Sequence, residues 1–423
     1  MATLSSSSSR TSGIVEAGGS QRASHLEESD REHEYKVSEL EKGGTMANLK
    51  SWETDPDNAR NWPSLKKWTT VFVIALYTLI PPLGSSMMAP GLPNIADIYG
   101  IHSKTITSLT LSVFLLSFAI GPLFLAPISE MYGRTWVFHI ANIFSIAFSL
   151  GCAFAPSTNA LIAFRFLSGF SGAAPIACGG GTIGDLFSEG ERGSAMAIYA
   201  MGPLIGPAVG PIAGGYLTEA FGIKWVFVTI AGACGVASLV GIPLLRETYA
   251  PVIRRHRTMR NGSPEKAFQQ AGLLQDVGKW EYLWINLSRP IMLLCKSFIC
   301  FILSLYMAFL YGIYYLMFAT FSSLYSTVYG FKTGPGGLVY LGLGLGFFFS
   351  TLACARCVDG MHRYLTLKNG GRGTPEMRMP ALFFGSLITP IGLFWYGWSA
   401  EAQLHWIMPI IGTGIFAFGM NAA

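Results

Sequence analysis

The sequence predicts an all-α polytopic membrane protein. Hydrophobic residues make up 51% of the 423-residue chain and charged residues only 13%, which is about half the charged share of a soluble domain. The charges are also clustered, so that apolar runs of about 20 residues lie between them, long enough to cross the hydrocarbon core. A helix satisfies its own backbone in lipid, whereas barrel strands give short alternating segments, so each run is expected to be a helix.

The chain begins with a polar segment, 1–66, which contains a serine run and no sustained apolar period. We expect this tail to be disordered and cytoplasmic. Ten apolar segments follow, and each is expected to span the membrane: 68–90, 106–128, 136–155, 160–183, 195–217, 224–245, 297–320, 336–357, 379–398 and 405–423.

A polar connection, 247–296, separates six of these segments from the last four. We therefore expect a six-helix bundle at 67–246 and a second bundle at 297–423, joined by a cytoplasmic loop. The "KWEYLWINLSRP" part of the connection mixes aromatic and charged residues, which is typical of a helix on the membrane surface.

Lysine and arginine placement predicts the orientation. One set of loops contains Arg134, Arg192 and the basic residues of the long connection, whereas the other set holds little beyond Lys104, Lys224 and Lys332. By the positive-inside rule, the N-terminus is cytoplasmic, and we expect the plasma membrane as the location. The basic residues lie between apolar runs, so the net charge of +5 fits contact with a membrane surface and not with a nucleic acid.

Several classes of function are not supported. The sequence contains no Walker lysine motif, nucleophile elbow or HExxH, so we expect neither an enzyme nor an ATP-driven pump. Cys354 and Cys357 form a lone CxxC without a second pair or nearby histidine ligands, so they are interpreted as small buried hydrophobes. No metal, cofactor or disulfide framework is expected.

The stretch "GPLIGPAVGPIAGG" recurs with a period of four. Small residues at this spacing form one stripe on a helix and allow a second backbone to approach closely. Proline is tolerated in membrane helices because neighbouring groups satisfy the freed carbonyls. We expect a closely packed, kinked helix at a moving interface, with simple helix packing as the alternative. The residues concerned are Gly202, Pro203, Gly206, Pro207, Gly210, Pro211, Gly214 and Gly215.

Two other stretches carry charge near or inside the membrane. In "GPLFLAPISEMYGR", Glu130 and Arg134 flank Gly133 in a very short loop, where they can pair or interact with helix ends; a simple positive-inside turn is equally compatible. In "RFLSGFSG", Arg165 lies inside the fourth segment. An intramembrane arginine costs about 2.5–3.5 kcal/mol, so it is expected to face a cavity or a partner, unless it snorkels to the headgroups.

The seventh segment carries an aromatic face formed by Tyr311, Tyr314, Tyr315 and Phe318. Such a face can stack an apolar or cationic ligand, although contact with lipid or another helix is the commoner arrangement. Carboxylates are scarce and lie near helix ends, so no buried acid stands out as a proton carrier. They are Asp97, Asp185, Glu219 and Asp359.

Taken in order, these three stretches resemble the major facilitator superfamily, in particular its fungal-type drug:proton antiporter branch with twelve helices. The segments "DPDNARNWPSLKKW", "RETYAPVIRRHR" and "SLYMAFLYGIYYLMF" resemble that branch too, so the similarity covers about 52–423. It implies proton-coupled efflux of small apolar or amphiphilic compounds by alternating access. The implied partners are a small-molecule substrate, protons and the bilayer, and the chain is expected to be a monomer.

The resemblance also implies roles for individual residues. Arg165 would serve proton coupling, and Glu130, Gly133 and Arg134 would form a cytoplasmic gate. The 202–215 stretch would be the antiporter motif facing the eighth helix, where Gly342 and Gly346 lie four apart. Glu130 stands where the wider superfamily has aspartate. The chain contains ten predicted helices, so we expect a C-terminal truncation; the alternative function is a non-transporting remnant or regulatory protein with the same fold.

Overall fold

The computed structural model of the protein describes residues 52–188, 191–260, 279–369 and 379–422. It has two compact units, Met1–Asn61 and Trp62–Ala423. In the first unit, the described part contains a 3-10 turn, η1 (Ala59–Asn61). All the long helices belong to the second unit, and no strand occurs in the part of the chain that the structure describes.

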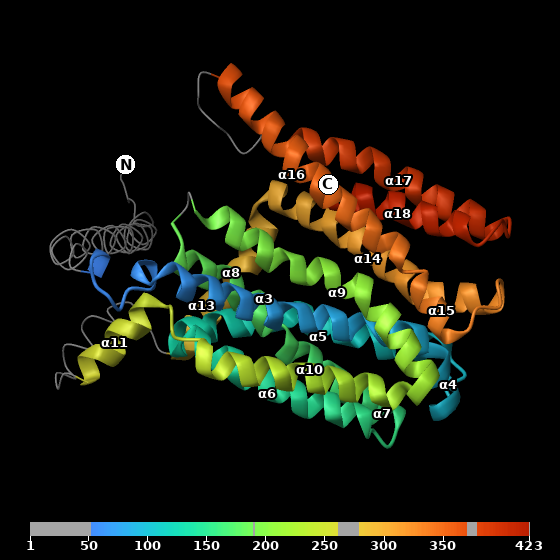
Figure 1. Ribbon diagram of the computed structural model, residues 1–423, viewed down its shortest axis with the longest axis horizontal. Helices are drawn as coiled ribbons and strands as arrows, with labels where there is room; N and C mark the ends of the chain where they lie inside the picture. The colour runs from blue at the N-terminus through green and yellow to red at the C-terminus, as the bar shows by residue number, and fades with distance from the viewer. Residues whose placement is uncertain (1–51, 189–190, 261–278, 370–378, 423) are drawn as a thin grey trace, which may run out of the picture. The chain divides into compact units, whose positions relative to one another are not determined.

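Helices α3 to α10 correspond to the first six predicted spans (Figure 1). Two spans are interrupted. The first consists of α3, the 3-10 turn η2 and α4, and the fourth breaks at Ala173, just before Pro175. The bounds are α3 Ser64–Ser86, η2 Ala89–Gly91, α4 Leu92–Tyr99, α5 Lys104–Tyr132, α6 Arg134–Ala153, α7 Thr158–Gly172, α8 Ala174–Leu186, α9 Arg192–Phe221 and α10 Ile223–Leu244.

The tail predicted at 1–66 therefore ends earlier than expected. Pro63 precedes the first turn of α3, and Lys66 lies in that turn with its ammonium 3.4 Å from the Trp62 ring centroid. The lysines at this point are helical because their charge can remain at the end of the span while the chain continues into apolar residues. The rest of the predicted tail, up to residue 51, lies outside the described residues.

The remaining helices follow the connection. Two helices lie within it, α11 (Ala250–Arg260) and α13 (Lys279–Lys296), and α13 corresponds to the mixed aromatic and charged segment. Ser297 caps α14, and its hydroxyl accepts a hydrogen bond from the Cys300 amide. The later bounds are α14 Phe298–Thr327, α15 Thr333–Leu338, α16 Leu341–Lys368, α17 Met379–Glu401 and α18 Ile407–Ala422.

Eight of the described helical segments are long and apolar enough to cross a membrane, judged by length and composition. The other two predicted spans fall on α17 and on the shorter apolar helix α18. The predicted all-α membrane fold is confirmed.

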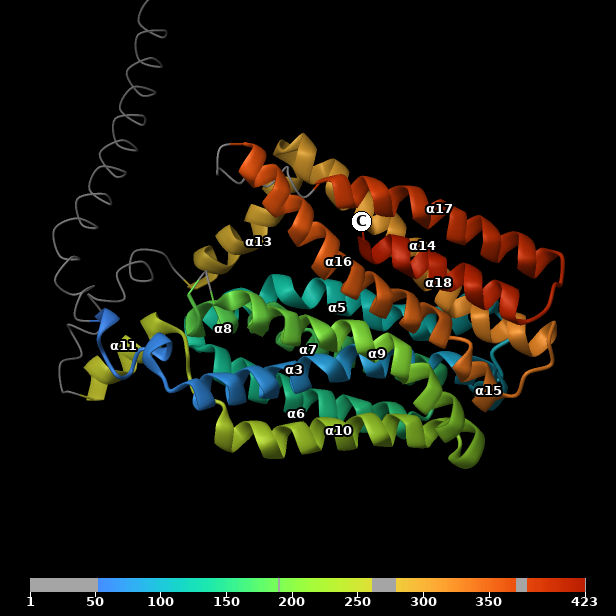
Figure 2. The same cartoon turned by 45° about the horizontal axis from the view of Figure 1, so that its top comes forward.

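The helices pack in two groups, α3–α10 and α14–α18. In the first group, α3 lies between α9 and α10, and α5 packs against α7 (Figures 1 and 2). In the second, α18 lies against both α16 and α17. Glycines allow these close approaches. A Cβ atom at Gly412 would lie 2.6 Å from the Tyr396 nitrogen, and one at Gly342 would lie 2.6 Å from the Ile410 carbonyl oxygen.

Candidate functional site

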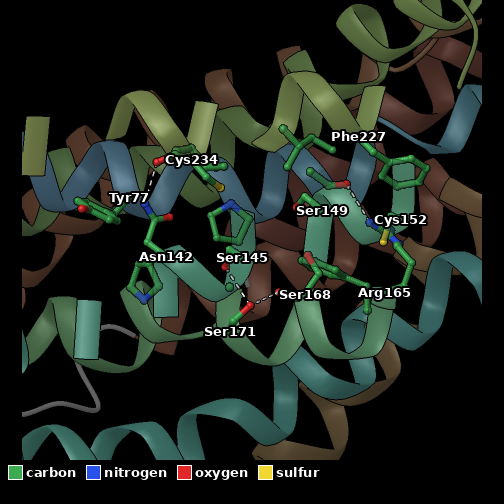
Figure 3. Close-up of a pocket in the computed structure, with 17 residues that line it drawn as sticks. Tyr77, Asn142, Ser145, Ser149, Cys152, Arg165, Ser168, Ser171, Phe227 and Cys234 are labelled. Carbon is green, nitrogen blue, oxygen red and sulfur yellow. Dashed lines mark hydrogen bonds between the residues drawn. The ribbon is translucent and has the colours of Figure 1, made fainter. Parts of the chain in front are cut away.

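A pocket lined by both apolar and polar side chains lies inside the first helix group and contains a cavity of about 20 Å³, room for about one water molecule. Arg165 and Cys152 lie toward one end of the pocket, and Tyr77 and Asn142 toward the other (Figure 3). Helices α3, α5, α6, α7, α8 and α10 all contribute lining residues. The pocket is therefore internal to one helix group and not located between the two groups.

Arg165 is 2% exposed, so it does not snorkel to the headgroups. Its Nε donates to the Thr110 carbonyl oxygen at 3.4 Å and its Nη1 to the Gly84 carbonyl oxygen at 3.3 Å. The guanidinium carbon lies 4.8 Å from the centroid of Phe114 and 5.9 Å from that of Phe227. Nη2 has no hydrogen-bond partner. The guanidinium is thus held by carbonyl dipoles and aromatic rings, and among the described residues it has no carboxylate partner.

The other polar side chains of the pocket are neutral, and they lie among apolar residues such as Ile80 and Ile230. Asn142 Nδ2 donates to the Cys234 carbonyl oxygen at 2.8 Å and to the Ser238 hydroxyl at 2.6 Å. The Ser145 hydroxyl donates to the Ser171 hydroxyl at 2.9 Å. These contacts connect α6 to α7 and α10, because each helix supplies a polar group that lipid could not satisfy.

A second cluster lies at the end of the helices near α11. Arg134 Nε donates to Asp185 Oδ2 at 2.7 Å, with the two side chains 10% and 22% exposed. The carboxylate that accepts this hydrogen bond therefore belongs to Asp185 and not to Glu130, which the sequence offered as one possible partner. The reason is geometric: Gly133 reverses the chain direction between α5 and α6, so the guanidinium points across to α8.

Glu247 completes this cluster. Its Oε1 accepts hydrogen bonds from the backbone amides of Arg134, Thr248 and Tyr249 at 3.0–3.1 Å, and its Oε2 from Thr135 at 3.2 Å. The carboxylate thus satisfies the free amides at the start of α6.

Gly133 and Tyr249 lie beside this cluster, and the contacts of both depend on it. Gly133 has φ +104°, and a Cβ atom there would collide with the Glu247 carboxylate. Burial raises the pKa of Tyr249, as do the nearby Glu130 and Asp185 carboxylates, so the phenol remains neutral beside the Arg134 guanidinium, 5.1 Å from its ring centroid. The cluster joins α6, α8 and the segment after α10.

Helix α9 continues without interruption through Pro203, Pro207 and Pro211. Its glycine stripe packs against α3. A Cβ at Gly202 would lie 3.0 Å from the Leu79 nitrogen and one at Gly206 2.8 Å from the Leu83 nitrogen, whereas Cβ atoms at Gly210 and Gly214 would collide with Ser86 and the Met87 carbonyl oxygen.

These four glycines therefore face α3, whereas the predicted contact of the 202–215 stretch with the eighth span, Thr333–Cys354, involves other residues of the stretch: a Cβ at Gly344 would lie 2.5 Å from the Ala208 Cβ. Gly342 and Gly346 pack against α18 instead. The reason is that the stripe spans only one face of α9, and α3 occupies that face.

A different face of α9 contacts α15 and α16. A Cβ at Gly215 would lie 2.7 Å from the Thr333 carbonyl oxygen, and a Cβ at Gly337 would collide with the Pro211 carbonyl oxygen. Glu219 Oε2 accepts a hydrogen bond from the Gly334 amide at 2.7 Å. These contacts connect the two helix groups at the end where α15 lies.

The predicted aromatic face of α14 is only partly turned inward. Tyr314 and Phe318 are 3% and 1% exposed, whereas Tyr311 is 48% exposed. The Tyr315 hydroxyl lies beside Ser85 of α3, so this part of the face meets the first helix group. Tyr314 also packs against Phe347, with ring centroids 5.7 Å apart.

Sequence reasoning missed several of these partners. The sequence identifies Asp185 only as an acid near a helix end, and it contains Glu247 only as part of the family-like segment "RETYAP". Their convergence on Arg134 depends on three-dimensional packing, although the position of Glu247 directly after a span was an available signal. No group of three metal-ligating side chains occurs among the described residues.

The fold and this arrangement of helices define a multi-pass membrane transporter. Residues 74–423 match the family described as "Major Facilitator Superfamily", and the chain belongs to that family, whose members are transporters and not enzymes.

The efflux pump radE of Floropilus chiversii is 39% identical over 378 residues, covering 88% of this chain and 70% of that protein. The MFS-type transporter penM of Penicillium rubens is 40% identical over 411 residues, covering 95% and 80%. The resemblance to a fungal efflux-type transporter is therefore confirmed.

Solved structures show the same fold at low identity. The xylose transporter XylE from E. coli, in a partially occluded inward open conformation, aligns with a TM-score of 0.62 and 13% identity, covering 85% of this chain and 82% of that one.

Proposed function

We propose that the protein exports small apolar or amphiphilic compounds, such as drugs, toxins or secondary metabolites, across the plasma membrane by using inward proton flow. Family membership and the relatives named efflux pumps support the direction. The lysine and arginine distribution supports a cytoplasmic N-terminus, which puts α11 on the cytoplasmic side and α15 on the outer side.

The observation that carries the proposal is that α9 packs against neighbouring helices through two different faces. One face packs through glycines against α3 within its own helix group, and the other contacts α15 of the second group. A helix fixed to one group but only in contact with the other suits alternating access, in which 67–246 and 297–423 rock against each other around a central site. Tyr315 and Tyr314 then border the substrate path.

In this mechanism the 202–215 stretch supports the outer gate. Glu130, Gly133 and Arg134 form the cytoplasmic gate, to which Asp185 and Glu247 are added. Arg165 couples transport to protons, because a buried guanidinium in this pocket responds strongly to any change in neighbouring charge.

Transport in proteoliposomes tests this function. Liposomes that contain the purified full chain are given an imposed pH gradient, and the uptake of a fluorescent amphiphilic compound is followed. We expect gradient-driven uptake that Arg165→Ala abolishes and that Lys224→Ala, which removes an exposed cation, leaves intact. Undiminished uptake by the Arg165 variant would remove the coupling role, and no uptake by the wild type would favour a non-transporting protein.

A further inference from the structure

Acidic residues in the described spans follow a simple rule of position. The eight helical segments able to cross a membrane contain four carboxylates, each within the last turn of its span: Asp97, Glu130, Asp185 and Glu219. Outside these eight segments, Asp359 lies within α16, five residues after Cys354, and Glu401 is the last residue of α17. The middle of each described span therefore contains no carboxylate.

Basic residues in the same spans lie in the first turn, with one exception. Arg165 is the eighth residue of the span Thr158–Leu186, and it is the only charged side chain outside the first and last turns of these eight segments. Arginine keeps its charge in proteins. Two carbonyl oxygens and two aromatic rings offset part of this charge, and no carboxylate among the described residues neutralises it. Arg165 thus places a positive charge inside the first helix group that no described carboxylate neutralises.

The surfaces that meet between the helix groups at this depth are neutral and aromatic. The Tyr315 hydroxyl lies beside Ser85, so uncharged hydroxyls are available as hydrogen-bond donors and acceptors. The aromatic rings already pack against one another: the Tyr314 ring contacts those of Tyr311, Tyr315 and Phe318. The buried rings of Tyr314 and Phe318 are therefore packed against neighbours and offer little cation–π attraction to a positively charged guest.

We infer that the substrates of the proposed export are uncharged or anionic aromatic compounds with hydrogen-bonding groups, and that lipophilic cations are disfavoured. A cation that leaves water for this site meets no carboxylate to replace its hydration. It also meets the field of Arg165, which at about 10 Å and an effective dielectric constant of about 20 weakens binding about tenfold. This inference rests on the proposed function only in treating the bound compound as a substrate for export, because the charge preference itself is a property of binding.

Isosteric ions of opposite charge test the inference. The purified full chain in nanodiscs is equilibrated with tetraphenylborate, tetraphenylphosphonium or the neutral triphenylphosphine oxide, and binding to empty nanodiscs is subtracted. We expect the neutral compound to bind about tenfold more tightly than the phosphonium, and the borate about tenfold more tightly than the neutral compound. Arg165→Met should reduce the borate-to-phosphonium affinity ratio about a hundredfold, because the borate loses an attraction and the phosphonium loses a repulsion. Lys224→Met, which removes an exposed cation, should preserve the ratio, and Tyr315→Phe should change the three affinities alike.

Equal or tighter binding of the phosphonium to the wild-type protein would overturn the inference, and so would a ratio that Arg165→Met leaves unchanged. If the Arg165 variant fails to fold, the wild-type comparison decides alone. The result is separable from the proposed function, because equilibrium binding needs no gradient. Proton-driven export with a preference for cations would refute only this inference, whereas the expected charge preference without export would refute only the proposed function.

Discussion

The glycine stripe of α9 gives a graded prediction for alanine substitutions. A Cβ at Gly202 would lie 3.0 Å from the Leu79 nitrogen, a contact that a shift of a few tenths of an ångström relieves, whereas one at Gly214 would collide with the Met87 carbonyl oxygen. Overpacking costs about 1–3 kcal/mol, and alanine in place of a helical glycine returns up to about 1 kcal/mol. We therefore expect Gly202→Ala to be nearly neutral and Gly214→Ala to lower the free energy of unfolding by about 1–2 kcal/mol.

Thermal unfolding in detergent, followed by tryptophan fluorescence, measures these differences. Gly235→Ala in α10 is the matched control, because no atom lies within 4 Å of its Cβ position. Its unfolding midpoint should equal or exceed that of the wild type. A Gly214→Ala protein as stable as the Gly235→Ala protein would refute the close α3–α9 contact.

Three further substitutions test contacts at the two ends of the helices. Asp185→Asn leaves the partly buried Arg134 without a charged partner and should cost about 1–3 kcal/mol; an unchanged unfolding midpoint would show that the pair adds nothing. Glu219→Ala should speed amide hydrogen exchange at the start of α15, which the control Glu401→Ala should not affect, and equal exchange in the two variants would argue against the hydrogen bond. Gly133→Ala should lower the free energy of unfolding by about 1–3 kcal/mol, because φ +104° is strained for alanine; a variant as stable as the wild type would argue against strain at this position.

The helices themselves could be predicted from the sequence because hydrocarbon thickness and backbone hydrogen bonding leave few alternatives. Span positions such as 106–128 and 224–245 agree with α5 and α10 to within a few residues. The Lys66 region shows why boundaries are harder: a charged first turn can be helical while its side chains remain in water.

The partners of the site residues were less predictable. Periodicity identified the glycine face of α9, but a period of four does not reveal which neighbour covers which face: α3 covers the four glycines, and the eighth span meets other residues of the stretch. Likewise, spacing along the chain offered Glu130 as one possible partner of Arg134, whereas Asp185, which accepts its hydrogen bond, lies 51 residues away in sequence. Arg165 was identifiable because a buried arginine has few acceptable environments.

Simultaneous recording of compound and proton movement tests the central claim most directly. Proteoliposomes with a pH-sensitive dye inside and no imposed gradient receive the transported compound, and lumenal pH and compound are followed together. If export is exchanged for protons, movement of the compound in one direction must drive protons in the other. The account predicts a pH change that requires the compound and disappears with Arg165→Ala. Movement of the compound without any pH change would contradict proton-coupled efflux.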